Sequence, residues 1–203
     1  MISSDIENGI NHIYKNDIFL AKIIENSEPC AISPKRKYYD MLLRSIIQQQ
    51  LSIYSAAAIH AKFLNHFNNE PVPERIIETP HLTLRGLGLS NAKVKYVKDL
   101  SEKIISGEVC LKGLRKKSDS EIANHLIQVK GIGEWTVHMF LIFTLGRLNV
   151  LPVGDLGVKR AIKNVYSLKN MPDEKKILKI SKQNGWEPYN SIACWYLWKS
   201  LEL

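Results

Sequence analysis

Cysteine is scarce in this sequence, and its distribution does not suggest disulfide bonds. The 203 residues include three cysteines, Cys30, Cys110 and Cys194, an odd number scattered along the chain. We therefore predict no disulfide framework and expect a reducing compartment. The six histidines show no spacing typical of zinc ligands, so no metal site is expected from side chains.

Long hydrophobic runs are lacking as well. The N-terminal region shows neither a signal peptide nor a transmembrane run, so we expect a protein that is not secreted and does not enter a membrane. The stretch 137–145 is apolar almost all round, which predicts a helix buried inside the fold. It is far too short to span a membrane.

Acidic residues are outnumbered by basic ones. Lys and Arg total 28 against 20 for Asp and Glu, which gives a formal net charge of +8. This balance fits a polyanionic partner, although many basic proteins bind none. The length suits one domain or two closely packed lobes with a real hydrophobic core.

Strand-like alternation is not convincing anywhere, whereas helical periodicity is nearly continuous. The clearest amphipathic stripe consists of Tyr39, Leu42, Leu43, Ile46 and Ile47. Further helices are predicted after Ser90 as N-cap, from Pro172 with Asp173 to about Gly185, and from Pro188. The sequence therefore predicts an all-α fold. In the last helix, Trp195 and Tyr196 are assigned to the core.

A helix–turn–helix corner stands out near the middle of the chain. Ser118 and Glu121 have the spacing of a capping box, which predicts a helix over about 119–128. Gly131 and Gly133 then break it, and a second helix is expected from Glu134. Main-chain amides at such a turn bind phosphate readily. The alternative is a plain corner in which glycine serves only as a C-cap.

One carboxylate follows in a glycine-flanked loop. Asp155 precedes a basic helix start that includes Lys159 and Arg160. A loop aspartate in this position is usually an N-cap. Beside a bound phosphate backbone it could also take part in acid–base chemistry, and the two roles are compatible.

These two stretches together resemble a known family. Leu126-x-x-x-x-Gly131-Ile132-Gly133-x-Trp135-Thr136, followed by Pro152-x-x-Asp155-x-x-Val158-Lys159-Arg160, resembles the helix-hairpin-helix-GPD superfamily of DNA glycosylases, in particular the DNA-3-methyladenine glycosylase II (alkylbase) enzymes. The likeness covers residues 38–198. It implies two helical lobes with a DNA-binding cleft between them, one over about 38–148 with the hairpin at 126–137, the other comprising 1–37 and 149–203.

The resemblance also implies a reaction. Such enzymes flip alkylated purines, such as 3-methyladenine and 7-methylguanine, out of double-stranded DNA and hydrolyse the N-glycosidic bond. Asp155 matches the catalytic aspartate, and Trp135, Trp198 and Met139 are the expected base-binding residues. Members that also cut the strand carry a lysine where this chain has Trp135, so a monofunctional enzyme that leaves an abasic site is implied. The alternatives are a glycosylase for another damaged or mismatched base and a non-catalytic helix-hairpin-helix protein.

Expected DNA contacts follow from the same match. They are Gly131, Gly133, Thr136, Lys159, Gln49 and Gln50. Gln50 matches the residue that fills the gap left by the flipped nucleotide, although the glutamines could equally cap their helix or face solvent. Lys93, Lys95 and Lys98 could neutralise phosphates or form a solvated helix face. At Asn190, relatives commonly carry arginine, which weakens the inference of a charged contact there.

No cofactor is expected. Relatives with an iron–sulfur cluster need four grouped cysteines near the C-terminus, where this chain has only Cys194. Hairpins of the family often hold a monovalent cation by main-chain carbonyls, here from about Ile127, Val129 and Ile132. The expected partner is double-stranded DNA containing damaged bases, bound by a monomer, in the cytoplasm of a prokaryote or the nucleus of a eukaryote.

Overall fold

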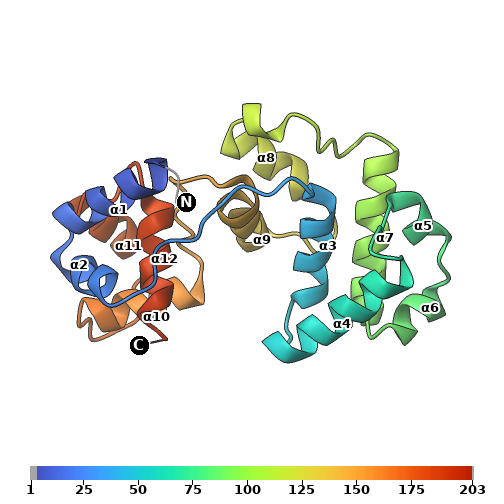
Figure 1. The fold of residues 1–203 in the computed structure, drawn as a ribbon, viewed down its shortest axis with the longest axis horizontal. Coiled ribbons are helices and arrows are strands. Elements are labelled where there is room, and N and C mark those ends of the chain that lie inside the picture. Colours follow the sequence, from blue (N-terminus) through green and yellow to red (C-terminus); the bar gives the residue numbers. More distant parts are fainter. Residues whose placement is uncertain (1–3, 203) are drawn as a thin grey trace. The chain divides into compact units, whose positions relative to one another are not determined.

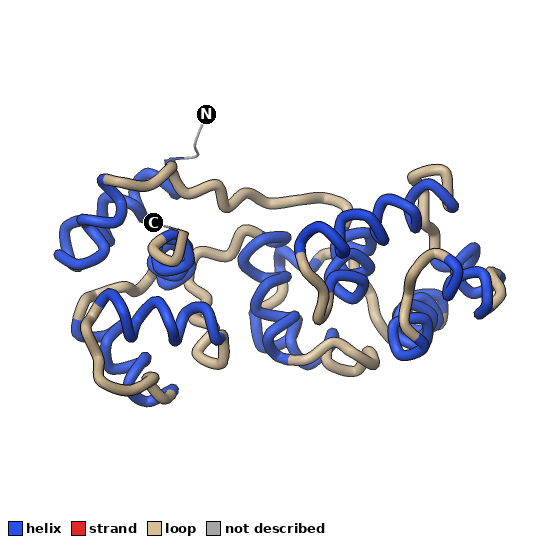
Figure 2. The backbone as a smooth tube through the Cα atoms, turned by 90° about the horizontal axis from the view of Figure 1, so that it is seen from below, coloured by secondary structure: helices blue, strands red, loops and turns tan. Residues whose placement is uncertain are grey.

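The computed structural model describes residues 4–202, with the side chain of Ile53 left aside, and this part of the chain is helical with no strand (Figure 1, Figure 2). This confirms the predicted all-α fold. The helices are α1 (Ser4–Asn16), α2 (Ile18–Glu25), α3 (Tyr38–Gln48), α4 (Ile53–His66), α5 (Pro73–Glu78), α6 (His81–Gly86), α7 (Asn91–Ile105), α8 (Asp119–Leu126), α9 (Glu134–Phe140), α10 (Leu156–Val165), α11 (Glu174–Gln183) and α12 (Asn190–Lys199). A 3₁₀ turn (Leu114–Lys116) and a π-helical turn (Leu141–Leu145) complete the set. None of the described helices is long and apolar enough to cross a membrane.

The chain forms two compact units. Unit 1 comprises Met1–Pro34 and Leu141–Leu203, and unit 2 comprises Lys35–Phe140. From the sequence, the lobe that contains the hairpin was expected to end near residue 148. In the structure unit 2 ends at Phe140, where the π-helical turn begins. The reason is visible at Phe143, whose ring packs against Trp195 and Trp198 of α12 at centroid distances of 6.2 and 5.6 Å. The turn therefore belongs to unit 1.

Unit 2 is built around α7. Helices α3, α5 and α6 pack on it, and the predicted α3 stripe is buried, with Leu42, Leu43, Ile46 and Ile47 at most 1% exposed. Ser90 caps α7 as predicted by accepting the Lys93 N–H at 3.2 Å. Tyr39 is tied to the same helix by a 2.7 Å hydrogen bond with Ser101. The local sequence signals thus correctly located α3 and α7.

Unit 1 is built around α12, against which α1, α2 and α10 pack (Figure 1). A buried carboxylate holds these elements together. Asp17 is fully buried and accepts the first amides of α2, from Phe19 and Leu20, at 3.0 and 3.1 Å. Its other oxygen accepts the indole N–H of Trp186 at 2.7 Å and the hydroxyl of Tyr166. Four donors therefore compensate the loss of hydration of this group.

Candidate active site

The hairpin lies in unit 2 between α8 and α9. The capping box of Ser118 and Glu121 is present, so the predicted helix start is confirmed, although α8 ends at Leu126 rather than Gln128. Gly131 has a φ of +83°, and a Cβ there would lie on the ring of Tyr96, 2.6 Å from its Cε2. A Cβ at Gly133 would meet nothing within 4 Å. The two glycines thus differ: the fold requires Gly131, whereas nothing in the described structure requires Gly133.

Asp99 of α7 fixes the start of the turn. Its Oδ2 accepts the main-chain N–H of Lys130 at 2.9 Å, and its Oδ1 lies 3.1 Å from the Lys130 ammonium. The carboxylate is largely buried while the lysine side chain is 72% exposed. Helix α9 begins at Glu134, so its first amides have no partners within the helix. The main-chain N–H donors at the start of α9 therefore follow a turn whose first residue, Lys130, is fixed by Asp99.

The α3–α4 corner, residues 49–52, is tied to this turn. Gln49 is the C-cap residue of α3, and its side-chain amide does not simply face solvent, because it donates to the Gly131 carbonyl at 2.8 Å. Gln50 is exposed and has a positive φ of 56°, a conformation uncommon for a residue other than glycine. It stands at the tip of the corner. Ser52 then caps α4 by accepting the Ser55 N–H at 3.3 Å.

The predicted row of lysines on α7 is largely used inside the protein. Lys93 donates to the Ile47 carbonyl at 2.8 Å and so holds the end of α3, and Lys98 donates to the Ile77 carbonyl at 2.9 Å. Partial burial lowers the pKa of Lys93. Only Lys95 is exposed as a phosphate contact or solvated face would require. The sequence could not show this, because the accepting carbonyls lie on other helices.

Two of the expected base-binding residues lie on α9. Trp135 is 49% exposed, and Met139, half-buried, is one turn further on the same face. An indole this exposed at a helix start is not a core residue. Thr136 is only 3% exposed, so its hydroxyl lies in the core and its main-chain N–H is the group through which a DNA contact remains predicted.

Asp155 lies in unit 1 as the N-cap of α10. It is 8% exposed, and its Oδ1 accepts two hydrogen bonds, from the Val158 N–H at 2.7 Å and from the indole Nε1–H of Trp198 at 2.9 Å. The capping role expected of such an aspartate is confirmed. The bond to Trp198 brings together two of the predicted site residues from positions 43 apart in the chain. Lys159, half-buried, follows in the first turn of the same helix.

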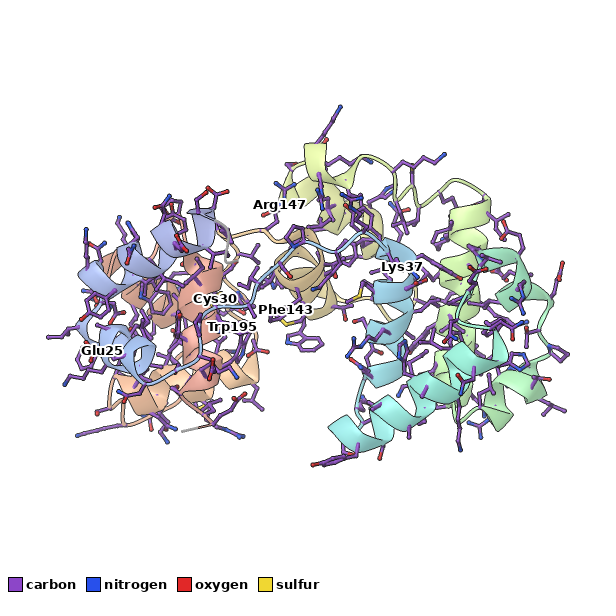
Figure 3. The ribbon with its side chains drawn as sticks, in the orientation of Figure 1. Glu25, Cys30, Lys37, Phe143, Arg147 and Trp195 are labelled. Atoms are coloured by element: carbon purple, nitrogen blue, oxygen red, sulfur yellow. The ribbon has the colours of Figure 1, made fainter. Side chains whose placement is uncertain are left out.

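The wall around Asp155 includes residues that the sequence did not indicate. A Cβ on Gly157 would lie 3.0 Å from Asp155 Oδ1 and 3.0 Å from Trp198 Cδ1, so glycine permits their close approach. The ring of Phe143 packs against Trp198 and against Trp195, which is labelled near it in Figure 3. Glycine beside a site aspartate was the available signal for Gly157. Phe143 had none, since its stretch is apolar throughout.

Three predictions from the sequence for residues of α12 have different outcomes. Tyr196 is in the core at 1% exposure, as predicted. Trp195 is only partly buried, so its assignment to the core was wrong; Phe143 covers one side, and the Lys199 ammonium lies 5.9 Å from its ring centroid. Asn190, where relatives commonly carry arginine, is 4% exposed and donates to the Asn149 side-chain oxygen at 2.7 Å. It is therefore a buried structural amide.

Cys194 lies on the buried face of α12. Burial chiefly, and the charge of Asp155 in addition, raise the pKa of its thiol. A thiol held neutral is not a nucleophile. None of the three cysteines forms a disulfide, as predicted.

Comparison with known proteins places this fold and these motifs in one family. The family model of the HhH-GPD superfamily of base excision DNA repair proteins matches residues 43–187, and the chain belongs to that family. It is 35% identical over 187 residues to DNA-3-methyladenine glycosylase 1 of Schizosaccharomyces pombe, covering 91% of this chain and 81% of the relative. The family resemblance drawn from the hairpin and aspartate motifs is confirmed.

Two solved structures of 3-methyladenine DNA glycosylases have the same fold as this chain. A 3-methyladenine DNA glycosylase of Schizosaccharomyces pombe in complex with abasic DNA superposes with a TM-score of 0.84 at 33% identity, covering 97% of both chains. A DNA-3-methyladenine glycosidase from Bacillus halodurans gives a TM-score of 0.81 at 34% identity, over 95% of this chain and 88% of that one.

Proposed function

We propose that this protein is a monofunctional DNA glycosylase of the DNA-3-methyladenine glycosylase II type. It removes alkylated purines, 3-methyladenine and 7-methylguanine among them, from double-stranded DNA by hydrolysis and leaves an abasic site. The observation that carries the proposal is the buried carboxylate of Asp155, oriented by the indole of Trp198 and the first turn of α10. Relatives at 33–35% identity are named for 3-methyladenine, and one was solved with abasic DNA, the product that such a reaction leaves.

The proposed chemistry needs a fixed negative charge. Breaking the N-glycosidic bond builds positive charge on the deoxyribose, and a carboxylate held against the sugar stabilises that transition state. The carboxylate can also orient or deprotonate the attacking water. Two donors on Oδ1 fix the orientation of Asp155 before the substrate arrives, so little reorganisation is needed during the reaction.

The proposed substrates suit indole rings. Purines alkylated at N3 or N7 carry a formal positive charge, which weakens their bond to the sugar and attracts them to an aromatic face. Trp135 offers an exposed ring and Trp198 a half-buried one whose N–H is already used by Asp155. Aromatic faces of this kind select charge more than a hydrogen-bonding pattern, so several alkylated bases should be accepted.

The main-chain amides of the hairpin are proposed to bind the DNA backbone. Gln50 would fill the gap left in the base stack by the flipped nucleotide, and Lys159 would lie near a phosphate. A monovalent cation fits the same turn, because Ile127, Val129 and Ile132 supply neutral carbonyl oxygens, the donors that such ions prefer. The Val129 carbonyl accepts the Ile132 N–H at 3.0 Å and keeps a second lone pair. When bound, the cation would add positive charge beside the DNA backbone.

The test is base release from methylated duplex DNA. We expect free 3-methyladenine and 7-methylguanine, a strand that stays intact until alkali is added, and no covalent complex after borohydride treatment. A borohydride-trapped complex would contradict the monofunctional assignment, since it requires a Schiff base. Release of a different base from a lesion panel would move the enzyme to another substrate class. DNA binding with no release of any base would leave a helix-hairpin-helix binding protein.

Replacing Trp135 separates substrate binding from general DNA binding. We expect Trp135→Ala to lower excision of 7-methylguanine about tenfold, the loss of roughly 1–2 kcal/mol of cation–π and stacking interaction. Affinity for undamaged DNA should change much less. Single-turnover rates and fluorescence anisotropy measure the two quantities, and an equal loss of both would show that the ring supports the fold or the backbone grip instead.

A further inference from the structure

Helix α4 opens with a tyrosine that the protein leaves in solvent. Tyr54 is 89% exposed, the highest value among the exposed large hydrophobic side chains of the described residues. It directly follows the α3–α4 corner, where Gln50 is exposed and Leu51 is 37% exposed. Single exposed hydrophobic residues are common, but Leu51 and Tyr54 are exposed together at a corner tied to the hairpin, which chance exposure does not explain.

The stretch of chain on either side of this tyrosine carries no charge. Residues 45–59 contain no acidic, basic or histidine side chain, although charged residues make up 24% of the chain. The exposed residues of α4 include Tyr54, Ala57, Ala58 and Ala61, spaced at i, i+3, i+4 and i+7, and the first exposed charge on the helix is Lys62, two turns beyond Tyr54. Lysine and arginine would be expected where phosphates are held. A ring flanked by methyl groups instead fits bases and deoxyribose.

The corner also holds the ring on a rigid support. Ser52 caps α4, Gln49 is bonded to the Gly131 carbonyl, and Lys93 holds the last turn of α3 through Ile47. Tyr54 is the second residue of the capped helix, so its Cα is fixed relative to both the hairpin turn and Gln50. A stacking residue placed in this way loses little backbone freedom on binding.

We propose that Tyr54 is a second DNA-stacking residue, and that its ring packs on a nucleotide that flanks the one extruded from the helix. The proposal rests on the proposed function, since it takes damaged DNA as the ligand. Extrusion removes a stacking partner from each neighbouring base. Gln50 fills the gap, and the ring of Tyr54 replaces part of the lost stacking from the same corner.

The experiment measures affinity for a duplex that contains a tetrahydrofuran abasic-site analogue, so that no catalysis is needed. The variants are Tyr54→Ala and Tyr54→Phe, with Leu82→Ala of α6, another side chain of unit 2 that is 82% exposed, as the matched control. We expect Tyr54→Ala to lose roughly tenfold in affinity, the scale of one base–aromatic stack. Tyr54→Phe and Leu82→Ala should stay within about twofold of wild type. Thermal unfolding of all three should match wild type, because both side chains lie in solvent.

A second experiment, photocrosslinking, locates the nucleotide that Tyr54 contacts. 5-Iododeoxyuridine placed at each position around the abasic analogue should crosslink to Tyr54 at a flanking position only, and this crosslink should disappear in Tyr54→Ala. Wild-type affinity in Tyr54→Ala would overturn the proposal. An equal loss in Tyr54→Phe would also overturn it, since the hydroxyl and not the ring would be responsible. Loss of a dimer with unchanged DNA affinity would assign the tyrosine to a contact between copies of the chain.

The two proposals can fail separately. If wild type binds the abasic analogue but releases no base from methylated DNA, the proposed function fails while the affinity series still decides the role of Tyr54. If wild type shows no affinity for the duplex, both are overturned.

Discussion

Asp155→Asn is expected to reduce base release from methylated DNA by roughly 10²- to 10³-fold, the scale seen when a single preorganised electrostatic group is removed from an active site. The substitution removes the charge and keeps the shape. An asparagine side-chain oxygen can still accept the Val158 N–H and the Trp198 indole N–H, which Oδ1 accepts in the present structure. Asparagine is also a good N-cap, so α10 should keep its stability. Single-turnover release of 7-methylguanine measures the effect.

The matched control is Asp173→Asn. Asp173 caps α11 in the same unit by accepting the Lys176 N–H at 2.7 Å, so it is the same substitution in the same local role. It is exposed and lies at no predicted site, and its activity should equal that of wild type. If Asp155→Asn retained activity within a few-fold of wild type, the carboxylate would be a cap alone and the reaction would need another group. If both variants unfolded at lower temperature, the loss would be one of capping.

Local patterns were sufficient for most of the framework. The Ser118–Glu121 capping box was predicted and is present, because a cap involves residues only three apart. The helix predicted from Pro172 is also present, although it begins at Glu174 with Asp173 as its N-cap. Gly185 follows the end of α11 with a φ of +57°, again a local signal. The sequence did not predict how α1 and α2 are joined to the rest of unit 1, since Asp17 meets Tyr166 and Trp186 across about three-quarters of the chain.

In the candidate site, too, local features were predictable from the sequence and contacts between distant residues were not. That Asp155 would cap a helix was readable from its neighbours, but its bond to Trp198 was not. Gln49 could be suspected at a helix end, yet its partner, Gly131, lies 82 positions away. The sequence allowed Lys93 to be either a phosphate contact or part of a solvated helix face, but its ammonium donates to the Ile47 carbonyl. Types and spacings identify the family's groups, whereas the contacts that orient them arise from tertiary packing.

The second large effect is expected at the hairpin, where Gly131→Ala and Gly133→Ala should fail in different ways. Gly131→Ala must place a side chain at φ +83° and on the ring of Tyr96. The left-handed conformation costs about 1–2 kcal/mol and the overpacking about 1–3 kcal/mol. We expect the free energy of unfolding, from denaturant titration, to fall by about 2–5 kcal/mol. In a Tyr96→Ala background the steric part should vanish, leaving the backbone cost.

Gly133→Ala should leave stability within about 0.5 kcal/mol of wild type, because a Cβ there meets nothing within 4 Å in the free protein. Its effect should appear only with DNA. If a phosphate approaches the amides of the turn, the added methyl group stands in its way, and affinity for duplex DNA should fall about tenfold, with a weaker dependence on salt. Unchanged affinity in Gly133→Ala would mean that no phosphate is held at this turn, since the glycine then serves neither the fold nor the ligand.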